Sequence, residues 1–172
     1  MGTPQAAVPS LQRCLSDWHQ VAAVYTQPDR PSGRGNKVKY SPVKDCALQN
    51  GIPVFQPLKI KTDEALTEFR SHEADLAVVV AYGRILPESF LRAFPRGAIN
   101  VHFSLLPKYR GLHALAWAML NCENELGWSV HIVNEFVDEA VKDLVSVVRS
   151  QRVRIGAQSL RHVALLAALR GN

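Results

Sequence analysis

Residues 75–82 read DLAVVVAY, and this apolar run decides the fold class. A continuous run rich in β-branched residues is typical of a strand that is buried on both faces, as in a parallel sheet. Charged residues precede the run and Gly83 follows it. It is far shorter than the roughly 18 apolar residues that a membrane-spanning helix needs.

Outward from this run, extended and helical segments alternate along the chain. Short apolar runs predict further strands at residues 21–26, 51–56, 98–103, 128–133 and 144–148. Helical spacing and capping residues predict helices at residues 41–49, 62–71, 85–94, 112–121 and 158–170. The alternation predicts an α/β fold, Rossmann-like, with three layers and a mostly parallel sheet. Ligands bind such sheets beyond the C-terminal ends of the strands.

The composition is that of a globular protein with a moderate basic excess. The chain has 172 residues, 47% of them hydrophobic, and carries 20 Lys and Arg against 15 Asp and Glu, a net charge of +5. This charge favours polyanionic partners without identifying one. Cys14, Cys46 and Cys122 are widely spaced, which argues against a disulfide framework and a zinc site and indicates a reducing, cytoplasmic compartment.

The segment INVHFSLLPKYRG at residues 99–111 carries the first candidate chemistry. Asn100 and His102 stand two residues apart near the end of a predicted strand, so their side chains share one face. An amide beside an imidazole can polarise a carbonyl group and stabilise the oxyanion that forms when an amine attacks it. The pair therefore points to acyl transfer. A strand-end pair that only satisfies backbone hydrogen bonds is the alternative.

Asp138 follows the predicted strand at residues 128–133. A carboxylate that arrives from a neighbouring strand end can orient His102 and relay a proton. A turn-stabilising aspartate is the alternative, because Glu135, Glu139 and Asp143 lie in the same loop. Position alone does not choose between these roles.

The stretch SGRGNKVKYSPVK at residues 32–44 is basic. It carries Arg34, Lys37, Lys39 and Lys44, with Tyr40 between them and no acid. Such a loop fits contact with a phosphate backbone, and a solvated basic loop is the alternative. The chain has neither GxxxxGK[ST] nor a GxGxxG after a strand, which disfavours nucleoside triphosphate and dinucleotide binding. It has no GxSxG, so a hydrolase triad has no support.

Six stretches together resemble a known family. They are MGTPQAAVPSL from Met1, TQPDRPSGRGNKVKYSPVK from Thr26, GIPVFQP from Gly51, ADLAVVVAYGRILP from Ala74, INVHFSLLPKYRG from Ile99 and GWSVHIVNEFVD from Gly127. They are similar to the N-terminal catalytic domain of the folate-dependent formyltransferases, in particular the methionyl-tRNA formyltransferase family. The resemblance covers about four-fifths of the chain.

The resemblance implies a function and a set of site residues. It implies transfer of a formyl group from 10-formyltetrahydrofolate to the α-amine of methionyl-tRNA, in translation initiation, with Asn100, His102 and Asp138 as catalytic residues and no metal. It implies that the folate is contacted by Ser104, Leu105, Leu106 and Pro107, with Tyr82, Gly83, Ile85 and Leu86 lining the pterin pocket. It also implies that the tRNA is approached by Arg34, Lys37 and Lys39.

The sequence also departs from the family pattern. Family members begin with a strand before MGTP, so we expect the sheet to lack its first strand. Glu139 and Ala140 stand where the family has a glycine-containing turn after the aspartate. We expect residues 1–140 to form an N-terminally truncated catalytic domain and residues 141–172 to complete it with a divergent strand and helix. We expect no C-terminal tRNA-binding β domain.

Two alternative functions stay open. One is a formyltransferase that acts on a small amine, such as an amino sugar or a glycinamide nucleotide. The other is a catalytically silent fragment that binds RNA or a partner protein. If the chain transfers formyl groups to methionyl-tRNA, we expect it to be a monomer with no DNA or membrane partner. We expect it in the cytoplasm, or in an organelle if a targeting segment is missing.

Overall fold

A computed structural model describes residues 1–32, 37–134 and 144–150. The described part of the chain divides into two compact units. The first holds residues 1–100 and 133–134, and the second holds residues 101–132 and 144–150. Strand β6 (Ala98–His102) begins in the first unit and ends in the second. The helices and mostly parallel strands confirm the predicted α/β class.

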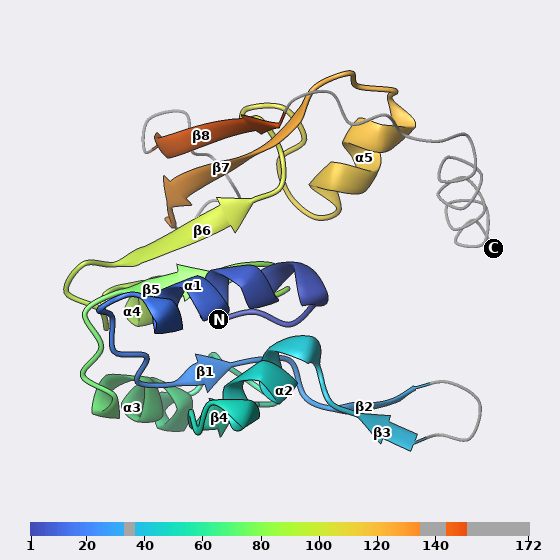
Figure 1. The fold of residues 1–172 in the computed structure, drawn as a ribbon. Helices are drawn as coiled ribbons and strands as arrows, with labels where there is room; N and C mark the ends of the chain where they lie inside the picture. Colours follow the sequence, from blue (N-terminus) through green and yellow to red (C-terminus); the bar gives the residue numbers. More distant parts are fainter. Residues whose placement is uncertain (33–36, 135–143, 151–172) are drawn as a thin grey trace. The chain divides into compact units, whose positions relative to one another are not determined.

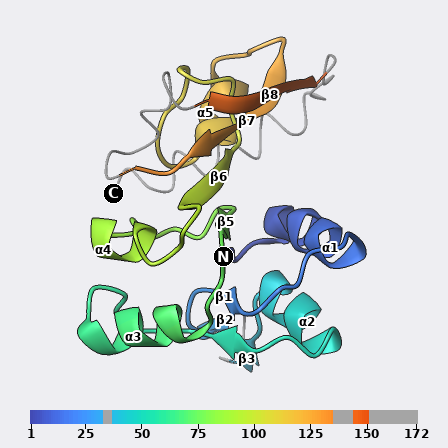
Figure 2. The same ribbon diagram turned by 90° about the vertical axis from the view of Figure 1, so that its left-hand side faces the viewer.

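The first unit has three layers. Strands β1 (Val24–Tyr25) and β4 (Val54–Phe55) pair in parallel, and β5 (Ala77–Val79) pairs in parallel with residues 98–100 of β6. Helices α1 (Val8–Ser16) and α2 (Pro42–Gln49) lie on one side of these strands, and α3 (Asp63–Ser71) and α4 (Glu88–Leu91) lie on the other (Figure 2). The strand predicted at residues 75–82 is shorter than its apolar run.

The sequence predicts that the sheet lacks its first strand. In the structure, Met1 and Gly2 make backbone contacts with residues next to or within β1 and β5. The Gly2 N–H donates to the Tyr25 carbonyl at 3.0 Å, and the Val80 N–H donates to the Met1 carbonyl at 2.9 Å. Gly2 forms a parallel bridge with Val80. A Cβ on Gly2 would lie 2.7 Å from the Val80 oxygen, so this close approach requires glycine. Two residues thus link β1 to β5, although no named strand precedes α1 in the described residues.

The N-termini of α2 and α3 in the first unit are capped by nearby side chains. The Ser41 hydroxyl accepts the Lys44 N–H at 3.1 Å, and Pro42 stands in the first turn of α2. The Thr62 hydroxyl accepts the Ala65 N–H at 3.2 Å at the start of α3. The predicted Thr62 cap and the predicted place of Pro42 are confirmed. The helix predicted at residues 85–94 is shorter, because Pro87 is extended and α4 begins only after it.

Aromatic side chains fill the core of the first unit. The ring centroids of Phe69 lie 4.1 Å from Tyr25 and 4.6 Å from Phe90. The Tyr25 hydroxyl donates to the Glu68 carboxylate at 2.9 Å. Burial and this carboxylate raise the pKa of Tyr25 far above its ordinary value, so the phenol stays protonated.

The second unit contains an antiparallel strand pair. Strands β7 (Leu126–Ile132) and β8 (Leu144–Ser150) pair antiparallel, so the strand predicted at residues 144–148 exists but reverses direction. A mostly parallel sheet commonly accepts an antiparallel edge. Helix α5 (Ala114–Leu120) begins two residues later than predicted, because His113 before it is left-handed, with φ +61°.

A β-ribbon replaces part of the predicted basic loop. Strands β2 (Arg30–Ser32) and β3 (Lys37–Lys39) pair antiparallel and project beyond α2 (Figure 1). We call these two strands the arm. The helix predicted at residues 158–170 lies outside the described residues. Within the described ranges, every helix is too short or too polar to cross a membrane.

Candidate functional site

His102 is buried at the C-terminal end of β6. Its side chain is 6% exposed, and its Nε2 lies 2.8 Å from the Tyr109 carbonyl oxygen. A carbonyl oxygen only accepts, so Nε2 carries the proton of this hydrogen bond. The ring also lies edge-on to that of His131, with centroids 6.4 Å apart. The hydrogen bond to Tyr109 holds the imidazole in one orientation.

Asn100 stands two residues before His102 on the same strand. It is partly buried, and it pairs in register with Val79 of β5. Both residues belong to β6, a strand on which side chains two residues apart are expected to share a face. Asn100 belongs to the first unit and His102 to the second.

The segment Ser104, Leu105, Leu106 and Pro107 leaves β6 as a loop that is fixed by hydrogen bonds. The Ser104 hydroxyl donates to the Lys108 carbonyl at 2.6 Å. The Ser129 hydroxyl, fully buried on β7, accepts the Leu106 N–H at 3.0 Å and donates to the Ser104 carbonyl at 2.8 Å. One side chain thus satisfies two backbone groups of the loop.

The loop forms one wall of a pocket in the second unit. The pocket has a volume of about 290 Å³. Residues 103–109, Ala118, Glu123, Glu125, Leu126 and Gly127 line it. Glu123 accepts hydrogen bonds from Lys108 and Tyr109, both at 2.9 Å, and these bonds lower the pKa of its carboxyl group. The pocket therefore combines leucine side chains, backbone polar groups and a carboxylate that stays ionised.

Replacement of Ser129 by alanine is expected to lower the free energy of unfolding by about 2 to 4 kcal/mol, because the partly buried Leu106 N–H and the buried Ser104 carbonyl both lose their partner. Urea unfolding followed by tryptophan fluorescence measures this, since Trp117 and Trp128 both lie in the second unit. The matched control is Ser71→Ala, whose exposed hydroxyl donates to the Glu68 carbonyl, and whose loss is expected to stay within about 0.5 kcal/mol. An equal loss of unfolding free energy in both variants would contradict the proposed contribution of the two Ser129 hydrogen bonds to stability.

Tyr82, Gly83, Ile85 and Leu86 lie in the first unit. The side chains of Tyr82 and Leu86 are buried in the core, whereas Gly83 and Ile85 are exposed. The Tyr82 hydroxyl has no hydrogen-bond partner among the described residues, and burial raises its pKa. The Tyr82 carbonyl accepts from Gln27 at 2.9 Å.

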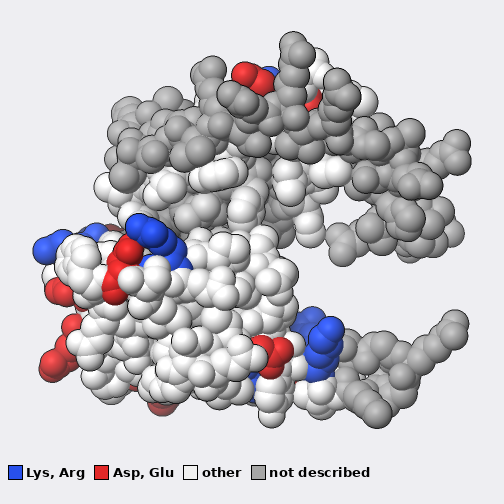
Figure 3. Space-filling view, in the orientation of Figure 1, with Lys and Arg blue, Asp and Glu red and all other residues white. Residues whose placement is uncertain are grey.

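The arm carries a cation pair that the sequence did not single out. Arg30 stands directly opposite Lys39 in the antiparallel register, and both are exposed. Like charges at such cross-strand positions repel each other. Within residues 1–32 and 37–134, neither side chain has an ion pair. Figure 3 shows basic atoms where the arm meets the undescribed segment.

The structure describes only some of the remaining predicted site residues. His102 and residues 104–107 lie in the second unit, and residues 104–107 line its pocket. Lys37 lies on β3. Asp138 and Arg34 lie outside the described residues. The sequence analysis did not single out Ser129 or Tyr109. Ser129 contacts residues that are distant in sequence, and Tyr109 contacts His102 through its backbone carbonyl. The described ranges contain no cluster of His, Cys, Asp and Glu that could hold a metal ion.

Comparison with known proteins identifies relatives over most of the chain. The formyl transferase family profile matches residues 1–150. Methionyl-tRNA formyltransferase of Trichlorobacter lovleyi is 48% identical over 138 residues, which cover 80% of this chain and 44% of that protein. The enzyme of the same name from Alkaliphilus oremlandii is 43% identical over 158 residues, which cover 92% and 49%. The chain thus spans about half the length of these curated relatives.

Solved structures share the fold. Phosphoribosylglycinamide formyltransferase from Anaplasma phagocytophilum superposes with a TM-score of 0.70 at 24% identity, covering 97% of this chain and 78% of that chain. At this identity the likeness concerns the fold.

Proposed function

The chain belongs to the formyl transferase family, and on this premise we propose that it transfers a formyl group from 10-formyltetrahydrofolate to the α-amine of methionyl-tRNA. One observation carries the proposal: relatives named methionyl-tRNA formyltransferase are 43% and 48% identical over stretches that include β6 and its loop. The stretches cover 80% to 92% of the chain. The proposed reaction belongs to translation initiation.

In the proposed reaction, the neutral amine attacks the formyl carbon and the carbonyl oxygen becomes an oxyanion. Asn100 stabilises this charge through its amide N–H, and His102 stabilises it through Nδ1–H of the doubly protonated ring, because its Nε2–H is engaged by the Tyr109 carbonyl. The Tyr109 carbonyl supports this role by fixing the orientation of His102 at 2.8 Å. A donor that is already oriented needs no rearrangement when the charge develops.

Asp138 is proposed to accept the amine proton and to hold His102, directly or through water. Collapse of the tetrahedral species breaks the bond between the formyl carbon and N10 of the folate. The proton from the amine then passes to N10, so that formyl-methionyl-tRNA and tetrahydrofolate leave with balanced charge. No metal is needed to balance this step.

The loop at residues 104–107 is proposed to contact the folate. Its backbone is held by Ser129, and its leucines border a pocket of about 290 Å³, close to the lower end of small-molecule sites at about 300 Å³. Tyr82, Gly83, Ile85 and Leu86 are proposed to line the pterin pocket. The buried Tyr82 hydroxyl supports this role, because a hydroxyl that has no partner among the described residues can bond to a ligand.

The arm is proposed to contact the tRNA through Arg34, Lys37 and Lys39, joined by Arg30. The opposed cations of Arg30 and Lys39 support this proposal, because an anion between them would relieve their repulsion. A formyltransferase for a small amine would have little use for such an arm. The three free thiols of Cys14, Cys46 and Cys122 support a reducing cytoplasm, where we propose that the chain acts as a monomer.

Competition between acceptors tests the proposal. With 10-formyltetrahydrofolate as donor, kcat/KM for methionyl-tRNA is expected to exceed that for glycinamide ribonucleotide or an amino sugar at least about a hundredfold, because the arm gains contacts only with RNA. Deacylated tRNA is the control for RNA binding without reaction. Preferred transfer to a small amine would replace the proposed acceptor. Binding of tRNA without any transfer would favour the silent RNA-binding alternative.

A further inference from the structure

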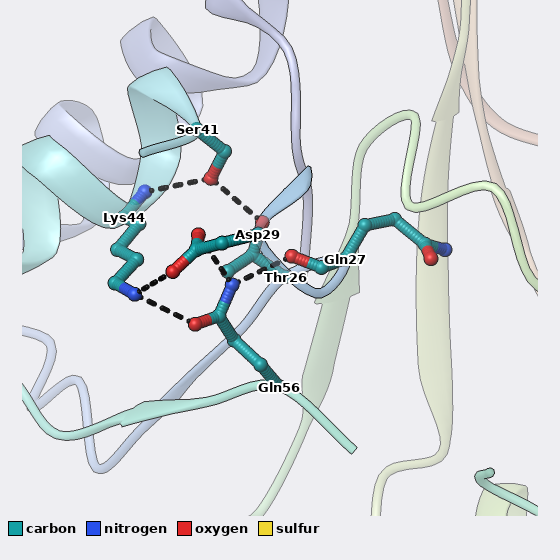
Figure 4. Close-up of polar contacts among 6 residues, drawn as sticks. All are labelled: Thr26, Gln27, Asp29, Ser41, Lys44 and Gln56. Carbon is teal, nitrogen blue, oxygen red and sulfur yellow. Dashed lines mark hydrogen bonds and ion pairs between the residues drawn. The ribbon is translucent and has the colours of Figure 1, made fainter. Parts of the chain in front are cut away.

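A polar cluster closes the base of the arm (Figure 4). The Lys44 ammonium group is paired with the Asp29 carboxylate and donates to the Gln56 Oε1 at 2.7 Å. The Gln56 Nε2 donates to the Asp29 Oδ1 at 2.9 Å and to the Gln27 carbonyl at 2.7 Å. Every polar atom at the ends of these three side chains is therefore engaged within the cluster.

The cluster joins both ends of the arm to the sheet. Asp29 immediately precedes β2, and Lys44 lies in α2, which follows β3. Gln56 follows β4 directly. The Lys44 ammonium also lies 4.0 Å from the ring centroid of Tyr40, which stands between β3 and α2. One ammonium group thus contacts the segment before the arm, the segment after it and the end of β4.

The ion pair is largely shielded from solvent. The side chains of Lys44 and Asp29 are 14% and 19% exposed. Desolvation opposes ionisation of Asp29, but the hydrogen bonds from Lys44 and Gln56 outweigh it and lower the pKa of the carboxyl group. Lys44, although part of the basic stretch, is therefore engaged internally. Asp29 in turn is held by Lys44 rather than by the adjacent Arg30.

We propose that Asp29, Lys44 and Gln56 form a positioning site for the arm. The site fixes where β2 and β3 leave the sheet, and it engages the Asp29 carboxylate so that this carboxylate does not pair with Arg30 or Lys39. The arm positioned in this way binds a polyanion, here the acceptor RNA, and in this respect the inference rests on the proposed function. The anchoring of the arm is a property of the free protein and is measured without RNA.

Replacement of Asp29 by asparagine tests the site with almost no change of shape. Lys44 and Gln56 both donate to the carboxylate, whereas an amide has one oxygen, so one donor loses its acceptor. Hydrogen exchange at the Lys39 amide, which faces Arg30 in the register, is expected to accelerate about tenfold, while exchange in α3 stays unchanged. Affinity for methionyl-tRNA is expected to fall about fivefold, although the variant gains one positive charge, which by itself would tighten RNA binding.

Asp45→Asn is the matched control. Asp45 is an exposed acid on α2 next to Lys44, so the variant makes the same charge change outside the cluster. Its exchange rates are expected to equal those of the wild type, and its RNA affinity is expected to stay equal or to tighten. Tighter RNA binding by Asp29→Asn, or unchanged exchange in the arm, would overturn the positioning site.

Lys44→Met and Lys39→Met separate positioning from phosphate contact. Lys44→Met is expected to accelerate exchange in the arm and to weaken RNA binding without changing the salt dependence of the affinity. Lys39→Met is expected to leave exchange unchanged and to reduce the slope of log K against log salt by about 1. A reduced slope for Lys44→Met would overturn the inference. Accelerated exchange together with no RNA binding by the wild type would support the anchoring and refute the proposed acceptor.

Discussion

Replacement of His102 by alanine is expected to lower kcat for formyl transfer about a thousandfold and to leave both KM values within about threefold. The imidazole is buried at the end of β6 and is held by the Tyr109 carbonyl. Its proposed contribution is made to a charge that exists only in the transition state, so its loss appears in kcat. Single-turnover formylation of methionyl-tRNA measures the chemical step directly.

Alanine also removes packing and a hydrogen bond, so a second variant is needed. His102→Gln keeps an amide donor for the Tyr109 carbonyl but cannot take up a proton as imidazole does. It is expected to unfold at nearly the same urea concentration as the wild type and still to lose at least about a hundredfold in kcat. A His102→Gln protein with wild-type kcat would refute the catalytic role.

His131→Gln is the matched control for loss of a buried imidazole. His131 is 3% exposed and lies on the adjacent strand β7, where its Nδ1 is 3.0 Å from the Ile132 carbonyl oxygen. The proposed mechanism gives it no contact with substrate. Its replacement is expected to reduce kcat by less than about tenfold. A loss as large as that of His102→Gln would show that packing, rather than chemistry, explains both effects.

The sequence predicted those features that depend on neighbouring residues. The cap of α3 needs only Thr62 and the N–H three residues later, so its local pattern was sufficient. The strand that carries Asn100 and His102 was predicted for the same reason, because its apolar residues lie within a short segment, 98–103. The family resemblance assigned the chemistry, and the profile match over residues 1–150 confirms the family.

The features that the sequence did not predict depend on contacts between distant residues. Ser129 meets the Leu106 N–H across 23 positions, and Lys44 meets Asp29 across 15. No local sequence pattern identifies the partner of the Ser129 hydroxyl or of the Lys44 ammonium group. The two-residue link by Met1 and Gly2 was missed because it is a backbone contact with Tyr25 and Val80, which no side-chain pattern encodes. The arm was predicted as a loop because its strands are short and polar.

Replacement of Asn100 by aspartate is expected to lower kcat more than replacement by alanine, by about a thousandfold against about a hundredfold. Asparagine and aspartate have nearly the same shape, and the strand position beside Val79 is retained. Alanine removes one proposed donor to the oxyanion. A carboxylate adds a negative charge where the transition state develops another, so it is worse than no side chain.

The order of the two Asn100 variants is the decisive measurement. Single-turnover rates of both are compared with Asn121→Asp, which makes the same chemical change at an exposed residue that caps α5. That control is expected to retain the wild-type rate, and urea unfolding of all three variants shows whether stability is altered. If Asn100 had only a structural role, the rates would follow stability, and the aspartate variant would not be the slowest. A faster rate for Asn100→Asp than for Asn100→Ala would therefore refute an oxyanion donor at Asn100.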